Sequence, residues 1–181
     1  HYFRNQDFTG KTPKSLVKDG EGRTKLEKFS EKTYGVRLGG PIVKDKLFFF
    51  VNYEHTKNNT PENYPVGSSS SNLLEADAKA IYDIALNKYK YDAGSYTDLA
   101  DENTSNKVMT RLDWNINEKN KLSLRYNYVD GVDMGNTRTQ SSLTFGNGAI
   151  LKDFKSNTLT LELSSRINNS LANSFIAGYS R

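Results

Sequence analysis

The sequence predicts an all-β fold, an antiparallel transmembrane β-barrel fragment built as a meander of hairpins. Three observations predict it: segments in which apolar and polar residues alternate, tight turns that join these segments at one end, and long connections at the other end. Short turns on one side and long loops on the other are typical of outer-membrane barrels, whose short turns lie in the periplasm and whose long loops lie outside the cell.

The first hairpin is predicted over residues 34–54, with a short turn at 43–45. Alternate positions of both strands are apolar, which indicates the two-residue period of a strand. Pro41 lacks an amide hydrogen, so it belongs at the strand end beside the turn. The apolar positions are Tyr34, Val36, Leu38, Ile42, Leu47, Phe49, Val51 and Tyr53.

Two more hairpins follow the same pattern. One is predicted over residues 107–128 with a turn at 117–120, and the other over 158–179 with a turn at 168–170. Strands of about 10 residues, tilted, are long enough to cross a membrane. Their apolar positions are Val108, Leu112, Trp114, Ile116, Leu122, Leu124, Tyr126, Tyr128, Leu159, Leu161, Leu163, Leu171, Phe175 and Tyr179.

Long polar connections are predicted at about residues 9–28, 58–104 and 131–153, after a strand stub at 1–8. The second connection contains one amphipathic helix at about 72–89. Asn72 can cap this helix, with Glu75 three residues later as in a capping box. We expect its apolar face to pack onto the loop itself.

The two faces of the predicted sheet have different chemistry. Charged side chains occupy one face, where hydrocarbon would not tolerate them but a lumen would, so they are candidates for lumen-facing, substrate-binding residues: Arg37, Glu54, Arg111, Asp113, Arg125 and Glu162. Aromatic side chains on the other face gather at two levels, which predicts a lipid-facing girdle of Tyr34, Tyr53, Trp114, Tyr126, Tyr128 and Tyr179.

The composition excludes several classes of site. The 25 lysines and arginines are interspersed with 21 aspartates and glutamates, so no nucleic-acid partner is expected. Without cysteine there is no disulfide or thiolate zinc site, and no run of 18 apolar residues is present to form a membrane-spanning helix. The chain starts at His1 in mid-pattern, and we expect it to be a piece of a longer protein.

No catalytic site, metal or cofactor is predicted. The stretch "NQDFTGKT" ends in Gly-Lys-Thr, but Asn5 stands where a phosphate-binding loop needs its first glycine. His1 and His55 are too few for a histidine-based site. Four acidic residues of the second connection lack the spacing of a known calcium loop, and solvated positions are expected for them. They are Asp92, Asp98, Asp101 and Glu102.

Two segments of the sequence carry a resemblance to a known family: "YGVRLGGPIVKDKLFFFVNYEHTK" and "NKVMTRLDWNINEKNKLSLRYNYVDG". They resemble the early-barrel hairpins of TonB-dependent outer-membrane receptors of the Oar-like type, and the loop helix followed by "YKYDAG" also has its counterpart there. The plug, the energy-coupling box and most strands of such receptors are not in this sequence, so the resemblance covers only the first third of a barrel. It implies a location in the outer membrane of a Gram-negative bacterium.

The resemblance also implies a function and partners. A substrate, which the sequence does not identify, would dock on the extracellular loops and pass through the barrel when the inner-membrane TonB energy complex moves the plug. The other partners would be outer-membrane lipid and the rest of the same barrel. Phe48 and Phe50, on the inner row of the first hairpin, would face the plug. Open sheet edges are not tolerated in hydrocarbon, so we expect a curved open sheet that needs further strands.

Two alternatives remain open from the residues alone. One is an outer-membrane adhesin or assembly barrel without transport. The other is a soluble glycan-binding β-domain, because a β-sandwich shows the same alternation.

Overall fold

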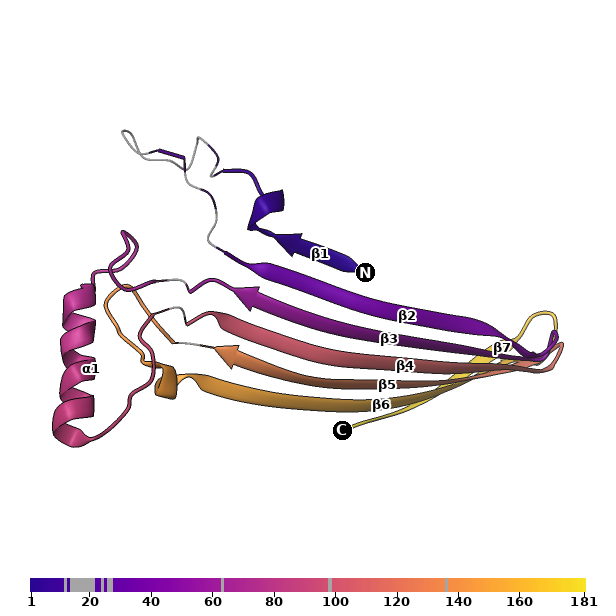
Figure 1. The fold of residues 1–181 in the computed structure, drawn as a ribbon. Helices are drawn as coiled ribbons and strands as arrows, with labels where there is room; N and C mark the ends of the chain where they lie inside the picture. Colours follow the sequence, from indigo (N-terminus) through magenta and orange to yellow (C-terminus); the bar gives the residue numbers. More distant parts are fainter. Residues whose placement is uncertain are drawn as a thin grey trace.

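The computed structural model describes residues 1–11, 13, 22, 23, 25, 28–62, 64–97, 99–135 and 137–181 (Figure 1). Its strands form one antiparallel sheet in which spatial order follows chain order, which confirms the predicted meander. The strands are β1 (Tyr2–Asn5), β2 (Ser30–Val43), β3 (Leu47–Thr60), β4 (Asp101–Asn117), β5 (Asn120–Gly135), β6 (Ile150–Arg166) and β7 (Ala172–Ser180).

The strands are longer than the alternation predicts. β2 to β6 contain 14 to 17 residues each, whereas about 10 are enough to cross a bilayer. The connection predicted at 58–104 begins only after Thr60 and ends before Asp101, and that at 131–153 is confined between Gly135 and Ile150. Most of the connection predicted at 9–28 lies outside the described residues.

The short turns lie at one end of the sheet and the long connections at the other (Figure 1). The β2–β3 turn is Lys44–Lys46, with Asp45 in the left-handed region at φ 60°. The Lys46 backbone N–H donates to the Val43 carbonyl at 3.0 Å, which closes this turn. In the β4–β5 turn the Asn117 side chain accepts from the backbone N–H groups of Lys119 and Asn120 at 2.9 Å each. These local bonds hold the tight turns.

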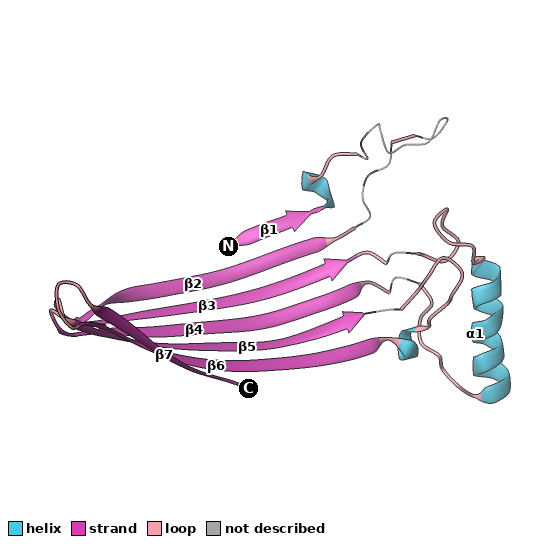
Figure 2. Ribbon diagram, turned by 180° about the vertical axis from the view of Figure 1, so that it is seen from behind, coloured by secondary structure: helices cyan, strands magenta, loops and turns pink. Residues whose placement is uncertain are grey.

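The sheet is a single curved layer with hardly any apolar core (Figure 2). Among the described residues, Ala78 and Ala93 are the only buried hydrophobic side chains, whereas Val36 and Leu38 are 65% and 66% exposed. A soluble β-sandwich needs a second sheet packed face to face on the first. All seven described strands belong to one sheet, so the sandwich fold considered above is wrong. No described helix is long and apolar enough to span a membrane.

The register keeps apolar residues on one face across the sheet. Residues directly opposite in antiparallel strands project to the same face. One such row runs through Phe49, Leu112, Leu124, Leu161 and Ala177. A face that is apolar over five strands suits contact with hydrocarbon.

The upper limit of the apolar face crosses the sheet obliquely. On β2 the unbroken outward run of apolar residues ends at Tyr34, whose row continues through Asp130 to Lys155 on β6. On β6 the unbroken run ends at Leu159, four positions lower, and the next outward apolar residue is Leu151, beyond three polar positions. That drop is roughly 13 Å over roughly 19 Å of sheet, which corresponds to a tilt of roughly 35°. Transmembrane barrel strands are tilted by about 35–45° to the membrane normal. The chemical boundary therefore has the slope expected of a level membrane surface.

The loop helix α1 (Glu75–Tyr89) lies beyond the strand ends (Figure 1). It begins three residues later than predicted, and the capping box at Asn72 is wrong, because Leu74 occupies the N-cap and makes no side-chain cap bond. The apolar face packs onto the loop only in part: Ala78 is buried, but Ile81 is exposed. The helix ends at Tyr89, and its C-cap, Lys90, adopts the left-handed conformation.

The sheet is open. Within the described chain, β1 pairs with β2 and β7 pairs with β6, and the two edge strands do not pair with each other. The expectation of a curved open sheet is confirmed. That further strands complete it stays a prediction.

Candidate functional site: the inner face of the sheet and the loop platform

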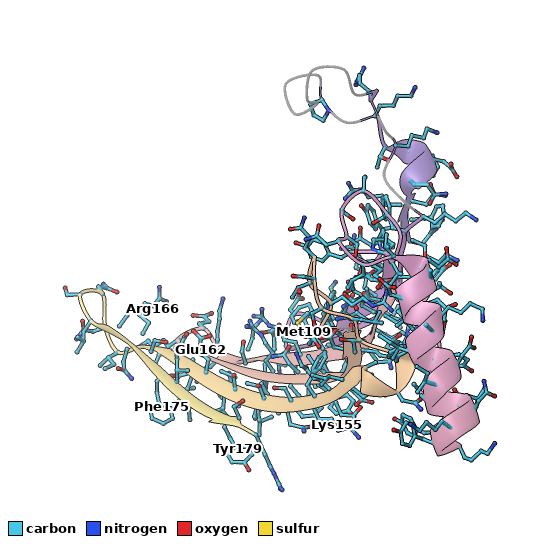
Figure 3. All side chains as sticks on the ribbon, turned by 90° about the vertical axis from the view of Figure 1, so that its left-hand side faces the viewer. Met109, Lys155, Glu162, Arg166, Phe175 and Tyr179 are labelled. Atoms are coloured by element: carbon cyan, nitrogen blue, oxygen red, sulfur yellow. The ribbon has the colours of Figure 1, made fainter. Side chains whose placement is uncertain are left out.

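The curvature separates an inner face from an outer face. Figure 3 shows Glu162 and Met109 on the concave side and Phe175 and Tyr179 on the convex side. The strand register places all six predicted lumen-facing residues on this inner face. They are Arg37, Glu54, Arg111, Asp113, Arg125 and Glu162. Whether any of them contacts a substrate stays a prediction.

A charged cluster occupies the inner face near the short turns. The Arg111 guanidinium donates from Nε to Asp113 Oδ1 at 2.9 Å, and the Ser123 hydroxyl donates to the same carboxylate. Arg111 stands directly opposite Arg125, an arrangement that is destabilising for an isolated pair. Glu162 stands opposite Ser123 on the next strand. Two arginines and two carboxylates therefore share one patch, and their formal charges cancel.

Two phenylalanines border this cluster on the same face. Phe48 lies opposite Asp113 and Phe50 opposite Arg111. The Phe50 ring lies over Gly39, where an added Cβ would be 3.0 Å from the ring. Both phenylalanines are half-buried by the sheet alone. The inner face is therefore charged and apolar side by side, unlike a uniformly polar pore lining.

A second ion pair lies higher on the inner face. Lys107 Nζ is 3.1 Å from Glu54 Oε1 across β3 and β4. Arg37 lies opposite Asn52, one row closer to the short turns. Exposed pairs of this kind contribute little to stability, typically below about 1 kcal/mol. These residues make the inner face polar at the level of Lys107 and Glu54.

The outer face carries the predicted girdle. The Tyr53 hydroxyl donates to Asn106 Oδ1 at 2.9 Å, and the Tyr126 hydroxyl donates to Asn157 Oδ1 at 2.7 Å. These bonds keep the phenol oxygens paired beside apolar surface. The remaining members share this face, Trp114 toward the short turns and Tyr34, Tyr128 and Tyr179 toward the other end. That the girdle contacts lipid stays a prediction.

Asn106 and Asn157 were not predicted as part of the girdle. A signal for them was available, because each occupies the outward position directly after the unbroken apolar run of its strand. An amide at that place can accept from a neighbouring tyrosine hydroxyl.

The two loops at the far end form one platform, defined here as α1 with the segments 91–97 and 137–149. Arg138 connects its parts. Its guanidinium donates to the Tyr96 carbonyl at 2.7 Å and to the Thr144 carbonyl at 2.9 Å, and it forms an ion pair with Glu62. Both charged side chains are almost fully buried, so this pair is shielded from solvent.

Backbone contacts also join the two loops of the platform. Gly146 N–H donates to the Ser95 carbonyl at 2.7 Å, and Asn147 N–H donates to the Ala93 carbonyl at 3.0 Å. Gly94 makes this approach possible, because its φ is +78° and a Cβ there would lie 2.9 Å from the Asn147 nitrogen. The platform is therefore held by main-chain bonds as well as by Arg138.

An aromatic cluster joins α1 to the other two segments of the platform. The ring centroids of Tyr82, Tyr96 and Phe145 lie 6.0 to 6.5 Å apart. The negative charge of Asp92 raises the pKa of Tyr82, so the Tyr82 phenol stays neutral to a higher pH than usual. On the same helix, the hydrogen bond to Asp83 raises the pKa of Lys79.

The acidic residues considered for calcium are not gathered in one place. Asp92 accepts from the Gly94 N–H at 2.9 Å, while Asp101 and Glu102 begin β4 and Glu102 lies 4.0 Å from Lys57. Asp98 lies outside the described residues. Among the residues that the structure describes, no group of three potential metal ligands is present.

Comparison with known proteins bears on the N-terminal half. Residues 1–88 match the family model described as an outer membrane beta barrel domain. The comparisons with curated proteins and with solved structures gave no match. The matched segment contains β1, β2 and β3, and it ends within α1. Together with the tilted single-layer sheet and its apolar outer face, this match identifies the fold as that of an outer-membrane β-barrel domain, located in the outer membrane of a Gram-negative bacterium.

Proposed function

We propose that this chain forms part of a TonB-dependent transporter, in which a substrate binds at the extracellular loops and enters through a plugged barrel. The observation that carries the proposal is the mixed inner face, where Phe48 and Phe50 adjoin the charged cluster of Arg111 and Asp113. Leaving a phenylalanine side chain in water rather than burying it forgoes about 1.5–3 kcal/mol. Apolar residues on an inner wall are stabilised when a folded body such as a plug covers them.

The charges fit the same interpretation. Arg125 and Glu162 have long side chains on the concave face of the sheet. These side chains can reach polar groups of a body that covers this face and pair with them. The loop platform supports the first step, because its two loops are held together before any ligand arrives and lie at the end opposite the short turns. No enzymatic reaction and no nucleic-acid partner is part of this proposal.

The test uses accessibility of the inner wall in living cells. The chain contains no cysteine, so Met109→Cys places a single thiol of this chain on the inner face. We expect a membrane-impermeant maleimide added outside the cell to label this thiol when the energy complex is active. Labelling should fall several-fold after the proton gradient is collapsed or the energy complex is deleted.

A control thiol at Thr97→Cys, at the loop end of the structure, should be labelled to the same extent under all conditions. Labelling of Met109→Cys that does not depend on energy would contradict transport. It would favour an adhesin or assembly barrel instead.

A further inference from the structure

We propose that a groove on the outer face, at the upper corner of β1 and β2, binds the phosphorylated headgroup of an outer-leaflet glycolipid. The groove has a volume of about 300 Å³. Its lining includes two lysines, an aromatic ring and three amide side chains: Lys28, Lys32, Phe3, Asn5, Gln6 and Asn59. This proposal rests on the outer-membrane location and not on transport.

The groove lies at the height of lipid headgroups. Lys32 is two residues above Tyr34, the last apolar outward residue of β2. Two residues of a strand correspond to roughly 7 Å along it, so the ammonium lies just above the hydrocarbon boundary. Phe3 is opposite Lys32 on the same face. A ligand in this groove would therefore meet the polar end of a lipid and the top of its chains together.

The charges of the groove are arranged for an anion. Lys32 stands directly opposite Lys57, and like charges in that position repel each other. Lys57 is 4.0 Å from Glu102, but both side chains are about half exposed, so this pair offsets the repulsion weakly. Among the described lining residues of the groove none is acidic. A phosphate between the lysines would remove the repulsion.

Apolar and basic residues continue around the groove. Lys32 Nζ lies 5.7 Å from the centroid of the Phe3 ring, and Phe3 makes an edge contact with Phe8, which is 74% exposed. Exposed phenylalanine rings beside lysines combine an apolar contact with attraction to anionic headgroups, as in segments that lie in a membrane interface.

The test measures binding of lipid A to the complete protein in detergent. The first probe is lipid A with both phosphates, and the second is the same lipid A after removal of its phosphates. The double variant Lys28→Ala/Lys32→Ala should bind phosphorylated lipid A roughly 10- to 30-fold more weakly, because each lysine near an anionic surface contributes attraction. Lipid A without phosphates should bind the unaltered protein as weakly as it binds the variant.

The matched control is Lys155→Ala. Lys155 is also an outward lysine above the apolar limit, on β6, but it is paired with Asp130 at 3.8 Å. Its replacement should change lipid A affinity by less than about twofold. Heat-modifiable migration on gels confirms that each variant is folded.

Two results would overturn the proposal. One is equal lipid A affinity for the double variant, Lys155→Ala and the unaltered protein. The other comes from inorganic phosphate as a third probe: if phosphate alone protects Lys28 and Lys32 from acetylation as well as lipid A does at the same concentration, the groove is an anion site without lipid selectivity.

Discussion

Leu124→Arg is expected to abolish assembly of the protein in the outer membrane. Leu124 lies on the outer face between Leu112 and Leu161, in the middle row of the apolar region. An arginine at the lipid-facing midplane costs about 2–4 kcal/mol. We expect little heat-modifiable protein in purified outer membranes and degradation of the remainder.

The control is the same substitution one residue earlier. Ser123 projects to the inner face, where it lies between Asp113 and Glu162. The substitution removes the hydrogen bond that Ser123 donates to Asp113, but the new guanidinium lies between two carboxylates. Ser123→Arg should therefore assemble almost normally. If the two variants assemble equally well or equally poorly, the assignment of the two faces is wrong.

Arg138→Met is expected to release the loop platform without affecting the sheet. The variant takes the arginine away from a buried ion pair with Glu62, and loss of one partner of such a pair costs about 3–5 kcal/mol. The bonds to the carbonyls of Tyr96 and Thr144 are lost as well. Limited proteolysis of intact cells should therefore cut the loops after β3 and β5 much faster than in the unaltered protein.

Two variants separate this effect from a general loss of charge. Lys79→Ala removes an exposed ion pair with Asp83, which contributes little to stability, and should leave the cleavage rate nearly unchanged. Adding Glu62→Gln to Arg138→Met removes the buried carboxylate that faced Arg138 and should restore part of the protection. Loops that are cleaved at the same rate in all of these variants would show that Arg138 does not hold them together.

The meander and its two faces could be predicted from the sequence because the side-chain period of a strand is two. A residue such as Leu112 is therefore assigned to a face without any knowledge of its neighbours. Arg111 and Arg125 share the predicted face, and their direct pairing depends on a register shift between Asn115 and Asn117 that the sequence did not reveal.

The strand ends could not be predicted in the same way. The upper ends of β3 and β4 are polar on both faces, in "HTKNNT" of β3 and "DENTSN" of β4, so their sequences resemble loops. Pairing between strands decides that they are extended. The helix start was misplaced for a local reason, since Asn72 suits a cap but lies two residues before the N-cap, Leu74.

The loop platform could not be predicted either. Arg138 reaches Glu62 across 76 positions of the chain, and neither residue belongs to a motif. Gly94 gives a weak signal for a turn but none for the approach of Gly146. Such contacts depend on the positions of the strand ends, which bring the two loops side by side.

A spin-label scan along β4 from Lys107 to Trp114 tests the central claim, that one face of this sheet meets lipid and the other an enclosed interior. Nitroxides would be placed singly at each position in the assembled protein, and their collision rates with oxygen and with a water-soluble nickel complex would be measured. We expect high oxygen accessibility at Val108, Thr110, Leu112 and Trp114 and low accessibility at the positions between them, a period of two in phase with the outer face. A scan without that period, or with its phase reversed, would contradict the account.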